Sequence, residues 1–124
     1  MLSTGVDIIE ISRIARTLER YGDRFLSRVY TPGELEYCRG RPSKLASRFA
    51  AKEATMKALG TGVRGVGWKD IEVTRAPSGA PGILLHGRAK ARAERLGVLE
   101  ISISMSDSQD NALAFVVTRR EDPD

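Results

Sequence analysis

Hydrophobic and polar residues follow two different periods along this chain, and the change between them marks the expected elements. Alternation, or a short β-branched run, predicts five strands, at residues 4–9, 68–74, 82–86, 99–105 and 111–118. Apolar residues three or four apart predict four helices, at residues 11–21, 32–38, 44–59 and 88–96. The order of these elements predicts an α+β fold, with an antiparallel sheet packed against one long helix.

Capping residues mark the expected ends of two helices. Thr31, followed by a proline and then by Glu34, has the spacing of a capping box, so Glu34 is explained without any chemistry. Pro42 is interpreted as a stop and Ser43 as the candidate N-cap of the long helix, which Gly60 closes.

The long helix carries the most informative pattern in the chain. Its apolar stripe consists of small residues and a few larger ones, namely Leu45, Phe49, Ala50 and Ala54. Such a helix can approach a neighbour closely, which predicts a nearly buried position for Glu53 and Lys57, one turn apart on one face. The pair is either an intrahelical salt bridge or a metal-binding carboxylate followed by a phosphate-binding ammonium.

Length and composition favour a small globular protein with an anionic partner. The 124 residues leave room for one domain, which we expect at residues 1–118, with a disordered tail at residues 119–124. The net charge of +4 suits nucleic acid, a phosphorylated small molecule or an acidic protein. The single cysteine, Cys38, excludes an intrachain disulfide. We recognise no signal peptide or membrane-spanning run, and therefore expect a cytoplasmic protein with no membrane partner.

The residue types present restrict the possible chemistry. No His/Cys cluster suggests zinc, and the only histidine, His86, is expected to end a strand rather than to serve in a catalytic triad. Asp7 lies inside a strand-like run, where it is either a cap for the next helix or a metal ligand. Asp7 and Glu53 are hard oxygen ligands among many cations, a combination typical of Mg²⁺ bound with a phosphate substrate.

Several motifs in this order resemble the holo-[acyl-carrier-protein] synthase family, the small 4′-phosphopantetheinyl transferases. The resemblance covers essentially the whole chain. Its motifs are Gly5-Val6-Asp7-Ile8 with Arg13, Phe25 to Thr31 with Glu34, Arg48-Phe49-Ala50-Ala51-Lys52-Glu53-Ala54, Lys57-Ala58-Leu59-Gly60-Thr61-Gly62, Asp70-Ile71-Glu72-Val73, Gly79-Ala80-Pro81 and Ser102-Ile103-Ser104.

The resemblance implies the family's fold and a defined reaction. Phosphopantetheine moves from coenzyme A to a serine of an apo acyl carrier protein in fatty acid biosynthesis, and adenosine 3′,5′-bisphosphate is released. Asp7 and Glu53 would ligate Mg²⁺ and, with Lys57, make up the catalytic residues. Glu53 is the candidate to take the serine proton, directly or through a metal-bound water.

The same resemblance implies how the substrates bind. Coenzyme A would contact two cations, a glycine-rich run and a turn, comprising Arg48, Lys57, Gly60, Thr61, Gly62, Ser78, Gly79, Ala80 and Pro81. The acidic carrier protein would dock on Arg13, Arg20, Arg24 and Phe25, although a basic helix face is also commonly just solvated. The family assembles as a homotrimer with sites between protomers, and we expect the same here.

One position departs from the family pattern. Met105 stands where the family usually has a histidine near the coenzyme, and its alternation with Ile101 and Ile103 predicts a packing role. This substitution motivates a second hypothesis, a non-catalytic relative that binds carrier protein or coenzyme A. A third hypothesis, a basic nucleic-acid-binding domain, requires exposed aromatics between cations, whereas the seven aromatics here have mostly core-like spacing.

Overall fold

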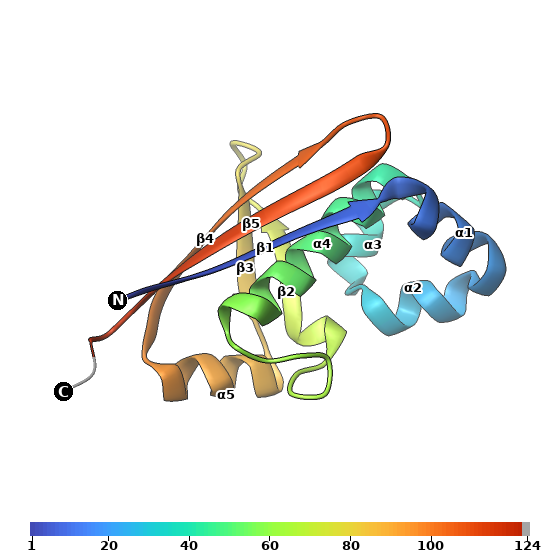
Figure 1. Cartoon of the computed structure of the whole chain (residues 1–124). Coiled ribbons are helices and arrows are strands. Elements are labelled where there is room, and N and C mark those ends of the chain that lie inside the picture. Colours follow the sequence, from blue (N-terminus) through green and yellow to red (C-terminus); the bar gives the residue numbers. More distant parts are fainter. Residues whose placement is uncertain (123–124) are drawn as a thin grey trace.

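One long helix, α4 (Pro42–Ala58), lies across the face of a three-stranded antiparallel sheet (Figure 1). The computed structural model describes residues 1–122. The sheet has the order β1-β5-β4 and consists of β1 (Leu2–Glu10), β5 (Asn111–Arg120) and β4 (Val98–Asp107). A separate hairpin pairs β2 (Ile71–Arg75) with β3 (Pro81–Leu85). The α+β class with an antiparallel sheet is confirmed.

Shorter helices cover the ends of this layer. Helices α1 (Ile11–Tyr21), α2 (Asp23–Val29) and α3 (Pro32–Cys38) follow β1 and form the right-hand part of Figure 1. Helix α5 (Gly87–Leu96) connects β3 to β4 and ends at Gly97, which has a φ of 72°. Helix α2 was not predicted, because Gly22, with a φ of 53°, interrupts a pattern that otherwise continues from α1.

Small residues let α4 pack closely on β1 and β5. Ala50, Ala51 and Ala54 are fully buried, and Gly5 of β1 faces them. A Cβ atom on Gly5 would lie 1.9 Å from the Ala54 carbonyl oxygen, so no side chain fits there. The prediction that the alanines bring this helix against the first strand is confirmed.

The long helix and the second strand begin at other residues than the sequence predicted. Helix α4 begins at Pro42 with Arg41 as its N-cap, so Ser43 lies inside the helix; a proline in the first turn loses no helical hydrogen bond. Residues 68–70 form a 3₁₀ turn, η1 (Trp68–Asp70), and not the start of a strand. The Asp70 carboxylate accepts a hydrogen bond from the Gly67 amide and favours this turn.

The predicted disordered tail also begins too early. Arg119 and Arg120 belong to β5, where Arg119 bonds Glu100 and Arg120 donates to the Ala58 carbonyl at the end of α4 (2.8 Å). Residues 123–124 lie outside the described part of the chain.

The capping box at Thr31 and Glu34 is confirmed, and Gly60, with a φ of 70°, follows the end of α4 as expected. Within residues 1–122, none of the helices combines the length and apolar character needed to cross a membrane.

Candidate active site

Asp7 and Glu53 lie next to each other where β1 meets α4. Burial raises the pKa of the Glu53 carboxyl, and the charge of Asp7 and a hydrogen bond to it raise that pKa further. Lys57 and Arg13 act in the opposite direction. The structure therefore brings together two carboxylates 46 residues apart in sequence (53 − 7), as the packing of the alanine-rich helix on the first strand predicted.

Lys57 pairs with Asp7 rather than with Glu53. Its ammonium lies 3.3 Å from Asp7 Oδ1 and donates to the Val6 carbonyl at 2.9 Å. The Lys57 side chain is 56% exposed, so the prediction of a nearly buried Glu53/Lys57 pair was wrong for the lysine. An exposed ammonium beside two carboxylates remains accessible to a substrate phosphate.

The two carboxylates suit a divalent cation that keeps most of its coordination for water and substrate. Among the residues described, no group of three or more His, Cys, Asp or Glu side chains could hold a metal by itself. Mg²⁺ is commonly bound through one or two carboxylates, with water and phosphate oxygens as its other ligands. A cation at this position would also relieve the repulsion that raises the pKa of Glu53.

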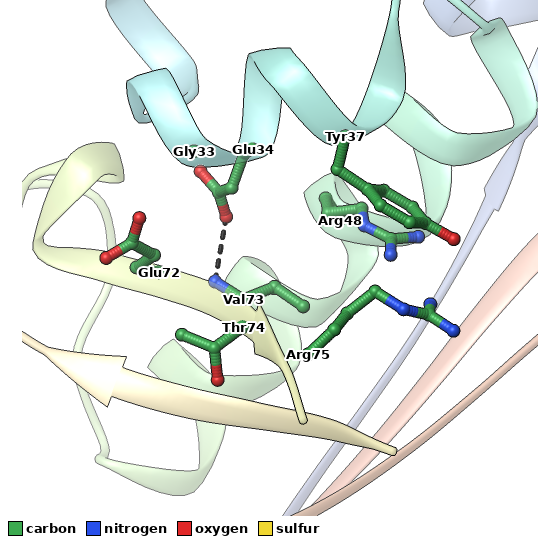
Figure 2. Close-up of a pocket in the computed structure, with 8 residues that line it drawn as sticks. All are labelled: Gly33, Glu34, Tyr37, Arg48, Glu72, Val73, Thr74 and Arg75. Atoms are coloured by element: carbon green, nitrogen blue, oxygen red, sulfur yellow. Dashed lines mark hydrogen bonds between the residues drawn. The ribbon is translucent and has the colours of Figure 1, made fainter. Parts of the chain in front are cut away.

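Arg48, five residues before Glu53 on α4, provides a second candidate contact. Its guanidinium is almost completely buried; Nη1 donates to the Ser47 hydroxyl (2.9 Å), while Nη2 has no partner. The guanidinium carbon lies 4.3 Å from the centre of the Tyr37 ring, and that of Arg75 lies 4.7 Å from the same centre. Figure 2 shows these three side chains together at one end of a pocket.

Two neighbouring cavities share Arg48 and Arg75. The cavity in Figure 2, of about 250 Å³, is lined by Gly33, Glu34, Tyr37, Arg48, Glu72, Val73, Thr74 and Arg75. The other, of about 270 Å³, is lined by Lys44, Ser47, Arg48, Arg75, Gly79, Pro81, Met105, Ser106 and Asp107. The predicted turn residues Gly79 and Pro81 therefore do share a cavity with Arg48, and Met105 lies in the wall of that cavity as well as against the core.

The other predicted coenzyme contacts lie at the far end of α4. Gly60, Thr61 and Gly62 follow its last turn and line neither of the cavities that contain Arg48. The Thr61 hydroxyl is buried without a hydrogen-bond partner. Within one chain, the predicted coenzyme residues thus form two groups, one around Arg48 and one beyond Lys57. Ser78 lies in the turn before β3 and is exposed, outside both cavities.

The predicted docking stripe starts beside the carboxylates and continues along α1 and α2. Arg13, Arg20 and Arg24 are exposed, and Arg13 is near enough to Glu53 to lower its pKa. Phe25 is half-buried and packs edge-on against Tyr30, with ring centres 5.7 Å apart. It also lines a surface cavity of about 400 Å³, together with Thr17, Tyr21, Arg24 and Arg28. This surface combines an apolar depression with a cationic rim.

Sequence reasoning missed the buried ion pair between Lys52 and Glu34. The two charged groups are 2.8 Å apart, and both side chains are 0% exposed. Glu34 had been explained by its capping box alone, and Lys52 had been given no role beyond its place in the family motif. The sequence signal was available, because Lys52 lies one turn after Arg48 and beside three alanines, on a face that must be buried.

Comparison with known proteins gives one consistent match. The family model of the 4′-phosphopantetheinyl transferase superfamily matches residues 3–116. A holo-[acyl-carrier-protein] synthase of Koribacter versatilis is 48% identical over 121 residues, covering 94% of this chain and 97% of that protein. One from Gloeobacter violaceus is 53% identical over 116 residues, covering 90% and 88%.

Solved structures agree with the sequence matches. The holo-[acyl-carrier-protein] synthase of Helicobacter pylori, in complex with coenzyme A, superposes with a TM-score of 0.86 at 33% identity, covering 94% of this chain and 99% of that one. The enzyme of Neisseria meningitidis superposes with a TM-score of 0.87 at 39% identity, covering 95% and 98%.

Proposed function

The chain belongs to the 4′-phosphopantetheinyl transferase superfamily, and we propose that it transfers phosphopantetheine from coenzyme A to a serine of an apo acyl carrier protein. The observation that carries this proposal is the Asp7/Glu53 carboxylate pair, with Lys57 bound to Asp7 and the exposed Arg13 near Glu53. This arrangement provides a cation site, a phosphate contact and the start of a docking surface within one small region.

Asp7 and Glu53 are the residues that would hold Mg²⁺. When bound, Mg²⁺ neutralises charge on the diphosphate of coenzyme A. Lys57 and Arg48 then bind coenzyme phosphates, and the partnerless Nη2 of Arg48 supplies a buried donor for one of them. Glu53 is also the candidate to take the serine proton, because its carboxylate lies beside Asp7 and near Arg13, where the docking stripe begins.

The acidic carrier protein docks on the stripe of Arg13, Arg20 and Arg24, with Phe25 and its cavity receiving an apolar side chain. Electrostatic complementarity of this kind speeds association and sets orientation. Because Arg13 lies beside Glu53, a carrier bound along the stripe has its serine close to the carboxylate pair.

An exposed apolar sheet face supports assembly into a homotrimer with sites between protomers. Val6 and Ile8 of β1 pair with Phe115 and Leu113 of β5, and all four side chains are exposed on the face opposite α4. Contiguous apolar surface of this kind usually marks a protein interface. Packing between subunits also offers a way for the Gly60–Gly62 group of one chain to approach the Arg48 group of another.

The position of Met105 indicates that replacing the family's usual histidine changes coenzyme binding modestly and does not abolish activity. Met105 lines the cavity next to Arg48, whereas the proton and phosphate chemistry is proposed at the Asp7/Glu53 pair. The competing hypothesis, a non-catalytic relative, predicts binding without transfer. The remaining context, fatty acid biosynthesis in the cytoplasm, is proposed from the family.

Mass spectrometry of an apo carrier protein incubated with the chain, coenzyme A and Mg²⁺ tests the function. The carrier should gain one phosphopantetheine, and Glu53→Gln should abolish this gain. The control is Glu94→Gln, which neutralises an exposed carboxylate on α5 far from the site. If the carrier binds but its mass stays unchanged with the unmodified chain, the non-catalytic hypothesis is correct and the proposal fails.

A further inference from the structure

The Lys52–Glu34 ion pair joins the three elements that surround the pocket of Figure 2. Lys52 comes from α4, and its ammonium donates to Glu34 Oε1 of α3 at 2.8 Å, to the Trp68 carbonyl at 3.0 Å and to the Ile71 carbonyl of β2 at 2.5 Å. An ammonium has three protons, so all of its donors are used. Lys52 is therefore not free to bind a substrate.

Glu34 is equally occupied. Its Oε1 also accepts from the Thr31 amide (2.8 Å), and its Oε2 accepts from the Val73 amide of β2 (2.8 Å), the contact drawn in Figure 2. A buried pair satisfied in this way adds little net stability over apolar residues, but removing one partner leaves an uncompensated charge. Its main consequence is to hold α3, α4 and β2 in one fixed relation.

The Arg48–Tyr37–Arg75 stack is made by the same three elements. Arg48 lies one turn before Lys52 on α4, Tyr37 one turn after Glu34 on α3, and Arg75 two residues beyond Val73 on the same face of β2. Each element thus supplies one residue of the stack, while α3 and α4 supply the ion pair and β2 binds it through the Ile71 carbonyl and the Val73 amide. The stack has no hydrogen bond among its members and depends on how the elements are placed.

We propose that Lys52 and Glu34 are positioning residues, whose ion pair sets the Arg48–Tyr37–Arg75 stack in the geometry that binds a coenzyme phosphate. This inference rests on the proposed function, because it takes Arg48 as a coenzyme contact. The two adjacent residues Lys52 and Glu53 thus have different roles. Glu53 takes part in the chemistry, whereas Lys52 affects coenzyme A binding by positioning Arg48.

The test compares the wild-type chain with Glu34→Gln and with the double variant Glu34→Gln/Lys52→Met, which buries no unpaired charge. Both variants should raise the KM for coenzyme A about tenfold, leave kcat within about twofold and weaken calorimetric binding of coenzyme A by a similar factor. Tyr30→Phe is the control, because it removes a different buried hydrogen bond to α4, the one to the Leu45 carbonyl. It should lower the melting temperature without raising KM.

Each outcome decides one claim. An unchanged KM and binding constant in a folded variant, or a loss confined to kcat, would overturn the positioning role. The same rise in KM in Tyr30→Phe would also overturn it, since general destabilisation would then explain the effect. If the wild-type chain binds coenzyme A but transfers nothing, the proposed function fails, while the calorimetric comparison still decides the inference.

Discussion

Replacing Gly5 by alanine tests the close contact that brings the two carboxylates together. The added Cβ would lie 1.9 Å from the Ala54 carbonyl oxygen and 2.9 Å from the Ala58 amide nitrogen, both backbone atoms of α4. Real Cβ atoms essentially never approach below 3.0 Å, so strand and helix must separate by about 1.1 Å (3.0 − 1.9). Since neither atom can rotate away, the whole helix has to move.

Overpacking of a well-packed core costs typically about 1–3 kcal/mol, and a clash with backbone belongs at the upper end. For a chain of this size, about 3 kcal/mol corresponds to a fall in melting temperature on the order of 10 °C. The same displacement moves Glu53 away from Asp7, so transfer activity should fall more steeply than the folded fraction. Thermal unfolding followed by circular dichroism, together with the carrier mass assay, measures both effects.

Gly62→Ala is the matched control for stability, because no atom lies within 4 Å of the Cβ it would add. It should change the free energy of unfolding by less than about 0.5 kcal/mol. A Gly5→Ala protein that melts within 2–3 °C of wild type would refute the reasoning, because a core able to absorb that methyl group is not packed as described.

Three further predictions follow from the site and its surroundings. The pKa of Glu53 is raised in the folded protein, so its protonated carboxyl stabilises the fold below the ordinary value of 4.5, and this stabilisation is lost as the pH rises through the raised value. Glu53→Gln should therefore have a higher melting temperature than wild type at pH 7 without metal, and the difference should shrink as the pH falls towards 4.5. Equal melting temperatures of Glu53→Gln and wild type at both pH values would contradict a raised pKa of the Glu53 carboxyl, whose causes are burial and the charge of Asp7. Arg13→Glu should raise the KM for carrier protein several-fold, and high salt should have the same effect on wild type; salt-independent kinetics would rule out electrostatic docking. In light scattering, the proposed homotrimer should dissociate to monomers in Phe115→Lys and stay intact in Arg119→Lys, on the same strand; a trimeric mass for Phe115→Lys would show that the β1–β5 face is not the interface.

The sequence predicted the elements that have strong local signals. Strand β1, helix α1, helix α5 with Gly97 and the capping box at Thr31 all follow from periodicity or from short-range hydrogen bonds. The proximity of Asp7 and Glu53 was also accessible, because alanines on one element and a glycine on the other permit a close approach. The elements set by local signals were therefore largely predictable, and so was this one long-range contact, because small residues on both elements permit it.

Contacts between distant segments were much harder to predict. The partner of Lys57 was misassigned because helical spacing favours Glu53, whereas the folded chain places Asp7 of β1 within 3.3 Å. Glu34 satisfied a local capping rule, and although the alanines around Lys52 indicate a buried face, no local pattern identifies Glu34 as the partner of its ammonium. Arg119 and Arg120 were assigned to a tail because their charge suggests solvent, although β5 continues through them and Arg120 caps α4.

The proposed transfer reaction depends most on Asp7 and Glu53 forming a single cation site. Calorimetric titration of Mg²⁺ in the presence of adenosine 3′,5′-bisphosphate measures this directly, with wild type compared with Asp7→Asn, Glu53→Gln and the double variant. We predict one site per chain in wild type, at least tenfold weaker binding in each single variant, and a loss in the double variant smaller than the sum of the two, since both ligands serve one ion. Unchanged Mg²⁺ affinity in both single variants would contradict the central claim.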